Sequence, residues 1–184
     1  MNDLRELLPS REQREKLERL IKKSPSPTLA RTNLVRLIES GGLRSFRKIP
    51  HRQFLPLFRL LGGSAYLSDI LIRHARDWLQ LFLRQAAAAQ KSIADHLTEL
   101  APVIGGVVSA DEFARALRHY KQREYLRIGA RDLSSFATVE ETMRELTALA
   151  EASLEAAYRF CRSEAERDFG PLCLPGTERP NRFV

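Results

Sequence analysis

Apolar residues recur every three or four positions through most of the chain, and short runs of Gly, Pro and Ser separate the periodic stretches. This spacing is typical of amphipathic helices, whereas a strand would need strict alternation. No stretch competes with helix except the final three residues. The pattern predicts helices over about residues 11–23, 28–39, 53–61, 65–75, 93–100, 109–134 and 138–168. We therefore expect an all-α fold, a multi-helix bundle.

The last two predicted helices are the most strongly marked. Ser109 with Glu112, and Thr138 with Glu141, each carry the signature of a capping box, in which side chains satisfy the free N–H groups at a helix start. Because only residues 135–137 separate the two helices, we expect a long antiparallel pair. In the second helix, eight positions predict the stripe that packs along a neighbour: Val139, Met143, Leu146, Leu149, Ala150, Ser153, Ala157 and Phe160.

After these helices the chain becomes rich in Pro and Gly. Proline lacks the N–H that a helix interior needs, so this stretch favours an extended tail over another helix. The residues that mark it are Pro171, Pro175, Gly176 and Pro180. We expect residues 1–168 to form a single helical domain and residues 169–184 to form an extended, Pro-rich C-terminal tail.

Length and composition agree with this organisation. The chain has 184 residues, of which 43% are hydrophobic and 29% charged, enough for one sizeable core. Its first residues are charged, and no run approaches the roughly 18 apolar residues of a membrane span, so we expect a cytoplasmic protein with no membrane partner. Cys161 and Cys173 lack the paired spacing of a zinc site. We expect both to be thiols, with Cys161 in or near the core.

The net charge of +7 raises the question of nucleic acid. Basic residues gain phosphate affinity by releasing counterions, but a binding face needs them gathered on one surface. Here the first third of the chain is the most basic, yet acidic residues interleave with the basic ones in its N-terminal helix. A solvated face, or a docking surface for an acidic protein, is therefore favoured over a nucleic-acid interface.

Residues 117–133 place their apolar and charged positions in an unusual way. At about 100° per residue, Leu117 and Ile128 fall on one side of a helix, while Leu126 and Ala130 fall roughly opposite. This helix is thus predicted to be apolar on two sides, which is typical of a helix that packs against two neighbours.

Three charged residues of this helix, Glu124, Arg127 and Arg131, form a stripe at i, i+3 and i+7 beside one of its apolar sides. We expect a partly buried ion network in which Glu124 pairs with Arg127 or Arg131, or in which the stripe meets carboxylates from the next helix. Asp132 is the fourth candidate member of this structural or interface network. The alternative is a basic surface helix whose charges are solvated, as charge runs usually are.

No arrangement of enzymatic residues is visible. His74 and His96 lie on predicted helices without a clustered second ligand, which favours structural, hydrogen-bonded roles. Glu164, Glu166 and Asp168 lie at spacings of two, which scatters them around a helix instead of converging them on a metal. We predict no catalytic, cofactor-binding or metal-ligating residue in this chain.

Four segments, in order, match the patterns of one protein family. Residues 62–74, GGSAYLSDILIRH, are similar to GxSxFLxxLLxRHP, and residues 117–133, LRHYKQREYLRIGARDL, to LRRF+xREhLRIAxRDL, where + is basic and h apolar. Residues 137–150, ATVEETMRELTALA, are similar to ADLEEVTxELSxLAD, while residues 169–171 and 182–184 resemble YGxP and the start of a catalytic strand. These patterns are those of the bacterial glutamine-synthetase adenylyltransferases, which transfer AMP to and from a tyrosine of glutamine synthetase.

The resemblance covers about residues 62–184 and implies the helical segment that precedes a nucleotidyltransferase domain. Ala75 departs from the pattern, which has proline there. Such domains hold a triphosphate with a Gly-rich turn and ligate Mg²⁺ with Asp-x-Asp on a strand. This chain has no Asp-x-Asp. The resemblance thus implies ATP and Mg²⁺ for the full-length family, while we expect this chain to carry no cofactor and to be inactive alone, its tail leading toward an absent catalytic domain.

Three hypotheses for function follow. The first is a non-catalytic helical portion, or truncated relative, of a protein adenylyltransferase that regulates glutamine synthetase, with glutamine synthetase or a separate catalytic domain as partner. The second is a free-standing helical protein-interaction module without a nucleotidyltransferase role. The third and weakest is a nucleic-acid-binding helical protein.

Overall fold

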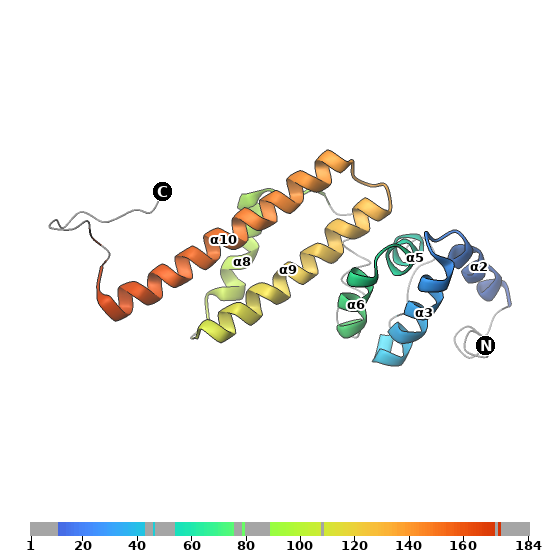
Figure 1. Cartoon of the computed structure of the whole chain (residues 1–184), viewed down its shortest axis with the longest axis horizontal. Coiled ribbons are helices and arrows are strands. Elements are labelled where there is room, and N and C mark those ends of the chain that lie inside the picture. Colours follow the sequence, from blue (N-terminus) through green and yellow to red (C-terminus); the bar gives the residue numbers. More distant parts are fainter. Residues whose placement is uncertain are drawn as a thin grey trace.

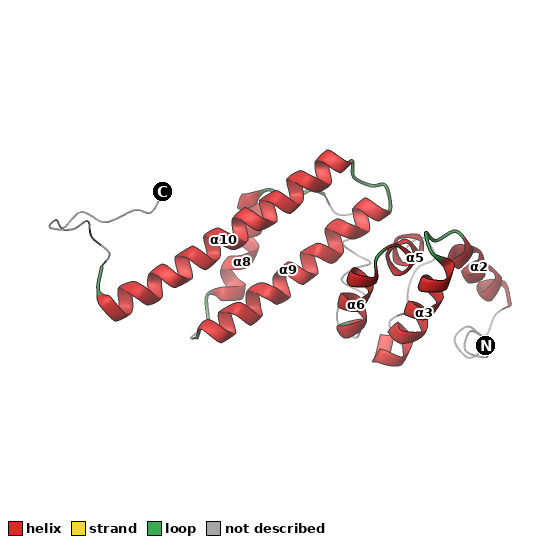
Figure 2. Ribbon diagram, viewed as in Figure 1, coloured by secondary structure: helices red, strands yellow, loops and turns green. Residues whose placement is uncertain are grey.

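The computed structural model describes residues 11–42, 46, 54–75, 79, 89–107, 109–171 and 173. Every regular element among these residues is helical, and none is a strand (Figure 2). The all-α prediction is therefore confirmed. In chain order the elements are α2 (Arg11–Lys22), α3 (Pro27–Leu37), the π-helical turn η1 (Ile38–Gly42), α5 (Phe54–Gly63), α6 (Ala65–Arg73), α8 (Ile93–Ile104), α9 (Ala110–Leu133) and α10 (Val139–Phe169).

Short polar side chains begin several of these helices. Each accepts a hydrogen bond from the backbone N–H three residues further on, which satisfies a donor that the first turn leaves free. These caps are Ser26, Ser64, Ser92, Ser109 and Thr138. Within η1, Gly41 has a φ of 94°, in the left-handed region that favours glycine, and the chain is kinked there. The sequence also carries the capping-box signature at Ser10 with Gln13, and Ser10 lies outside the described residues.

The apolar side chains form two clusters, at opposite ends of an elongated molecule (Figure 1). The first cluster joins α2, α3, α5 and α6, and the second joins α8, α9 and α10. Helix α9 belongs to both, since Leu126 and Ala130 pack in the first cluster and Tyr120 and Ile128 in the second. The prediction that this helix is apolar on two sides is confirmed. Its charged stripe lies on the side of the second cluster, facing α10.

Helix α9 approaches α6 closely at Gly129. A Cβ added at this glycine would overlap the side chain of Leu67, so only a glycine lets the two helices come this near without a shift. After α9 the chain turns at residues 134–138, where Ser135 adopts a φ of 58°. Helix α10 then runs back along α9 (Figure 1). This packing brings the charged stripe of α9 against α10.

The face that α10 buries differs from the predicted stripe. Leu149 and Ser153 are buried as expected, but Val139, Met143 and Leu146 are 67%, 63% and 40% exposed. The residues that α10 buries are instead Glu145, Ala148, Leu149, Ala152, Ser153 and Ala156. The prediction was wrong for Val139, Met143, Leu146 and Ala150, because α10 has two faces at helical spacing and small residues allow the closer approach to α8 and α9. It holds for Leu149 and Ser153, and Ala157 and Phe160 pack against the second cluster.

The structure also bears on two further expectations, the burial of Cys161 and the lack of a membrane-spanning helix. Cys161 is exposed, so its predicted place in or near the core is wrong. Within the described residues, no single helix has the length and apolar character to cross a membrane. Helices α5 and α6 have the length and hydropathy of a membrane span only when taken together, and they are bent by 118° at the break between them.

Candidate functional site

Buried charged side chains meet where α9 faces α10. Glu124 and Glu145 are fully buried, and Arg127 between them is 1% exposed. The Arg127 Nε atom donates to Glu124 Oε2 at 2.7 Å, and its Nη1 atom pairs with Glu145 Oε1. Arg131 Nη1 donates to Glu145 Oε2 at 2.9 Å. One carboxylate from α10 thus holds two guanidinium groups from α9, and one of these also holds a carboxylate of its own helix.

The segment before α8 is tied to the same charges. Lys91 Nζ donates to Glu124 Oε1 at 3.0 Å and to Glu99 Oε2 at 2.7 Å. The backbone N–H of Lys91 donates to Glu145 Oε1 at 3.1 Å, and Arg127 Nη1 donates to the carbonyl oxygen of Ala89 at 3.4 Å. These contacts join a non-helical segment to three helices. We call the whole group the ion cluster: Lys91, Glu99, Arg123, Glu124, Arg127, Arg131 and Glu145.

A histidine and a tyrosine extend the ion cluster toward α8. The Tyr120 hydroxyl donates to Glu99 Oε2 at 3.1 Å, and its oxygen lies 2.8 Å from Nδ1 of His96. Since this hydroxyl proton is directed at Glu99, a neutral His96 donates from Nδ1 to the tyrosine oxygen. Arg123 lies over the ring of Tyr120, with its guanidinium carbon 5.0 Å from the ring centre. His96 is fully buried, in the hydrogen-bonded role that the sequence suggested.

The surroundings shift the pKa of three of these groups. Burial alone would raise the pKa of Glu124, but hydrogen bonds and charges from Arg127 and Lys91 outweigh it, so the pKa lies below its ordinary value. Burial lowers the pKa of His96, so the imidazole is neutral at pH 7. Burial, together with the charges of Glu124 and Glu99, raises the pKa of Tyr120. At neutral pH the carboxylate is therefore ionised, and the histidine and phenol are uncharged.

Three of the four residues singled out from the sequence, Glu124, Arg127 and Arg131, lie together in the ion cluster. Asp132 lies outside it, because one residue along a helix turns the side chain by about 100°. It is exposed and accepts a hydrogen bond from the Thr142 hydroxyl at 3.2 Å.

Sequence reasoning named neither Lys91 nor Glu145. For Glu145 a signal exists, since it occupies the same face as Ala148, Leu149 and Ala152, where a solvated carboxylate would not be placed. Lys91 lies in a loop before α8 and carries no periodic signal.

The chemistry of the ion cluster is that of a structural clamp. Each carboxylate is met by basic groups, which leaves no free base or nucleophile among its acidic members. In the part of the chain that the structure describes, no three His, Cys, Asp or Glu side chains are grouped so that they could hold a metal ion. The arrangement can fix the relative positions of α8, α9 and α10.

The amino-acid sequence of this chain is similar to those of known proteins. A family model described as "Glutamate-ammonia ligase adenylyltransferase" matches residues 54–184. The chain is 30% identical over 125 residues to the "Bifunctional glutamine synthetase adenylyltransferase/adenylyl-removing enzyme" of Shewanella woodyi, covering 67% of this chain and 13% of that protein. The protein of the same name from Thioalkalivibrio sulfidiphilus is 30% identical over 162 residues, 86% of this chain and 16% of that protein. No solved structure matches.

The chain therefore spans only about a seventh of the length of these relatives. All residues of the ion cluster lie within the part that the family model matches. The resemblance drawn from the sequence motifs is confirmed: this chain belongs to the glutamate-ammonia ligase adenylyltransferase family.

Proposed function

We propose that this chain is a non-catalytic helical portion of a protein adenylyltransferase that regulates glutamine synthetase, and that it serves as a rigid brace for the catalytic region. The observation that carries the proposal is the ion cluster. It joins α8, α9, α10 and the segment at Lys91 inside the region matched by the family.

A buried ion cluster suits a brace because it is more demanding of geometry than an apolar contact. A salt bridge removed from water is stable only when its hydrogen bonds are well placed, while loss of one partner leaves a buried charge. The Glu145 carboxylate is bound by two arginines of α9 and by the backbone of Lys91. A shift of α10 along α9 would break these contacts together, so the helices are held in one register.

The remaining parts of the proposal come from the relatives. Their names describe enzymes that act on glutamine synthetase, so we propose ATP and Mg²⁺ as cofactors of the full-length enzyme and not of this chain. Glutamine synthetase or a separate catalytic domain is the proposed partner, and the cytoplasm is the proposed location.

The first test is an assay of the chain alone. We expect glutamine synthetase incubated with the chain, ATP, Mg²⁺ and glutamine to remain unmodified, because the chain has no Asp-x-Asp to ligate the metal. Mass spectrometry of the acceptor tyrosine measures the product. AMP on that tyrosine above a control without the chain would contradict the non-catalytic assignment.

The second test addresses the brace. Residues 54–184 of this chain replace the matching segment of the Thioalkalivibrio sulfidiphilus enzyme, and AMP transfer to glutamine synthetase is measured. We expect the chimaera to be active and the same chimaera with Glu145→Ala to lose most of that activity. Glu155→Ala, which removes an exposed carboxylate paired with Arg159, is the matched control. Equal activity of the three chimaeras would refute the role of the ion cluster.

A free-standing interaction module is the second candidate, and the exposed apolar side chains of α10 favour it. The DNA that follows codon 184 distinguishes the two candidates. A Gly-rich turn and Asp-x-Asp in that DNA would favour a truncated enzyme, and their absence would favour the free module.

A further inference from the structure

Helix α10 carries a row of apolar side chains that this fold leaves in solvent. Val139, Met143 and Leu154 are 67%, 63% and 71% exposed, and Leu146 and Ala150 are exposed between them. At about 100° per residue these five side chains lie within an arc of about 80°. They form one ridge over several turns, which we call the α10 stripe: Val139, Met143, Leu146, Ala150 and Leu154. Contiguous exposed apolar surface of this kind marks interaction sites.

Acidic side chains border the α10 stripe. Glu140 and Glu151 are exposed on one edge, at about 80° and 100° from the centre of the stripe. Asp132 is exposed on the other edge, where it accepts the hydrogen bond of Thr142. Arg144 lies on the first edge, further from the stripe, and its Nε donates to the carbonyl oxygen of Glu140. The stripe is therefore an apolar ridge between acidic borders.

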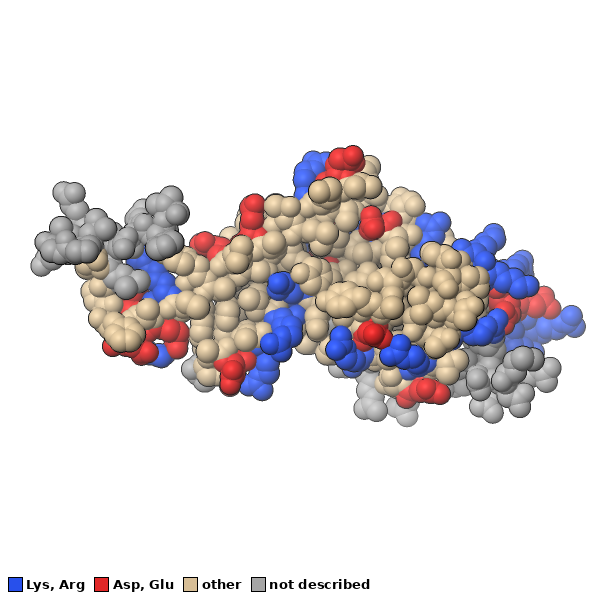
Figure 3. Space-filling model, viewed as in Figure 1, with Lys and Arg blue, Asp and Glu red and all other residues tan. Residues whose placement is uncertain are grey.

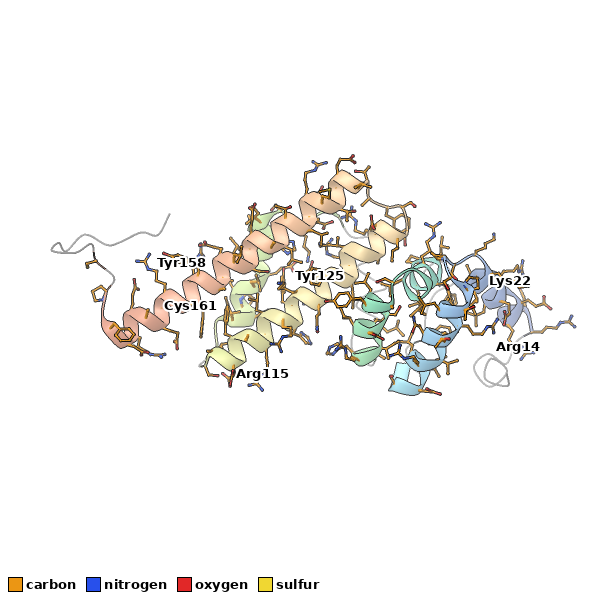
Figure 4. The ribbon with its side chains drawn as sticks, in the orientation of Figure 1. Arg14, Lys22, Arg115, Tyr125, Tyr158 and Cys161 are labelled. Atoms are coloured by element: carbon orange, nitrogen blue, oxygen red, sulfur yellow. The ribbon has the colours of Figure 1, made fainter. Side chains whose placement is uncertain are left out.

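This local charge opposes the charge of the whole chain, which is +7. In Figure 3, basic side chains gather over α2, whereas uncharged and acidic surface predominates along the first half of α10. Figure 4 places Arg14 and Lys22 at the α2 end of the molecule and Tyr158 on α10 toward the other end. The acidic borders are thus a property of the stripe and not of the protein surface in general.

We propose that the α10 stripe binds an amphipathic helix of a partner protein, whose apolar ridge is bordered by lysine or arginine. A helix docks on such a surface through residues at i, i+3, i+4 and i+7. Basic residues beside that ridge would meet Glu140, Glu151 and Asp132, which sets orientation and partner choice. The proposal uses only the stripe and its borders, so it does not depend on the proposed brace.

Charge also argues against a second copy of this chain as the occupant. An antiparallel two-fold pair of α10 helices would place the same edge of each stripe against itself, and a parallel pair would place the two acidic edges against each other. In the antiparallel pair the edge with Glu140 and Glu151 would meet its own carboxylates, and like charges in contact are destabilising. The acidic borders therefore favour a basic helix over self-association.

The test uses the whole chain and a fluorescent synthetic peptide. The peptide is a helix of about 18 residues with leucine at i, i+4, i+7 and i+11 and lysine at the bordering positions. A matched peptide has glutamate in place of lysine. Fluorescence anisotropy should show binding of the lysine peptide at least about tenfold tighter than that of the glutamate peptide. The chain's net charge of +7 would favour the opposite order if binding were non-specific.

Variants locate the binding. The double variant Met143→Ser with Leu154→Ser should weaken the lysine peptide at least about tenfold, while Tyr66→Ser, at a tyrosine of α6 that is 58% exposed, should leave binding unchanged. Glu151→Lys should weaken the lysine peptide and strengthen the glutamate peptide. Failure of the lysine peptide to bind, or equal binding by the double variant, would overturn the proposal. Concentration-dependent dimerisation that the double variant abolishes would also overturn it and assign the stripe to a second copy.

Discussion

The substitution Glu145→Ala tests the ion cluster most directly. This carboxylate is fully buried and binds Arg127, Arg131 and the backbone N–H of Lys91. Without it, Arg131 has no carboxylate partner in the ion cluster and Arg127 keeps only Glu124. Two guanidinium groups then face each other in a place shielded from water.

Breaking a buried ion pair by removing one partner lowers the free energy of unfolding by about 3 to 5 kcal/mol. An exposed pair contributes under about 1 kcal/mol. Glu155, whose side chain is 41% exposed and pairs with Arg159 at 2.6 Å, is the matched control on the same helix. We therefore expect Glu145→Ala to be destabilising by at least about 2 kcal/mol more than Glu155→Ala.

Urea unfolding followed by far-ultraviolet circular dichroism measures both variants. For a chain of this size each kcal/mol corresponds to about 2 to 4 °C in Tm, so thermal scans give a second reading. Glu145→Gln keeps the shape and removes the charge. If Glu145→Gln is as stable as the unsubstituted chain, or if Glu145→Ala and Glu155→Ala shift the midpoint equally, the reasoning from buried charge is refuted.

The other predictions use the same measurement. Arg131→Ala should be more destabilising than Arg118→Ala, since Arg131 is buried on Glu145 and Arg118 is exposed. Equal midpoints of the two variants would show that the charged residues of α9 contribute no more to stability than a surface charge does. Gly129→Ala should be destabilising, because the added Cβ overlaps the Leu67 side chain of α6; overpacking costs about 1 to 3 kcal/mol, of which the helix propensity of alanine offsets about 1 kcal/mol, and an unchanged midpoint would show that the Leu67 side chain moves aside. The pKa of His96 and that of Glu124 both lie below their ordinary values of 6.5 and 4.5. The unfolded chain therefore binds more protons in acid, and stability should fall first below about pH 6.5 and again below about pH 4.5. A flat profile between pH 7 and pH 5 in urea titrations would contradict the assignment of His96 as buried and neutral.

The part of the fold that local chemistry determines could be predicted from the sequence. The caps at Ser109 and Thr138 depend on side chains three residues or fewer from the groups they bind, so spacing alone identifies them. The two-sided packing of α9 follows from Leu126 and Ile128, which helical geometry places on different faces.

Which face of helix α10 is buried could not be predicted from the sequence. Helix α10 has apolar residues on one face and small residues around Glu145 on the other. Periodicity gives both faces the same spacing of three and four, and a hydrophobic count favours the wrong one. Lys91 was not found for a related reason: it reaches the ion cluster from a loop, where no period constrains its side chain.

The burial of Glu145 and the exposure of the α10 stripe are physically linked. Burying a Val, Leu or Met side chain fully stabilises a fold by about 1.5 to 3 kcal/mol, so turning Val139, Met143 and Leu154 inward would add apolar burial, offset in part by the exposure of Leu149, Ala152 and Ala156. That rotation, of about 140°, would carry Glu145 into solvent and leave Arg127 and Arg131 buried without it. The loss of several buried ion pairs outweighs the apolar gain, because each unpaired buried charge is destabilising by several kcal/mol. The ion cluster therefore sets the orientation of α10, and the same orientation presents the α10 stripe to a partner.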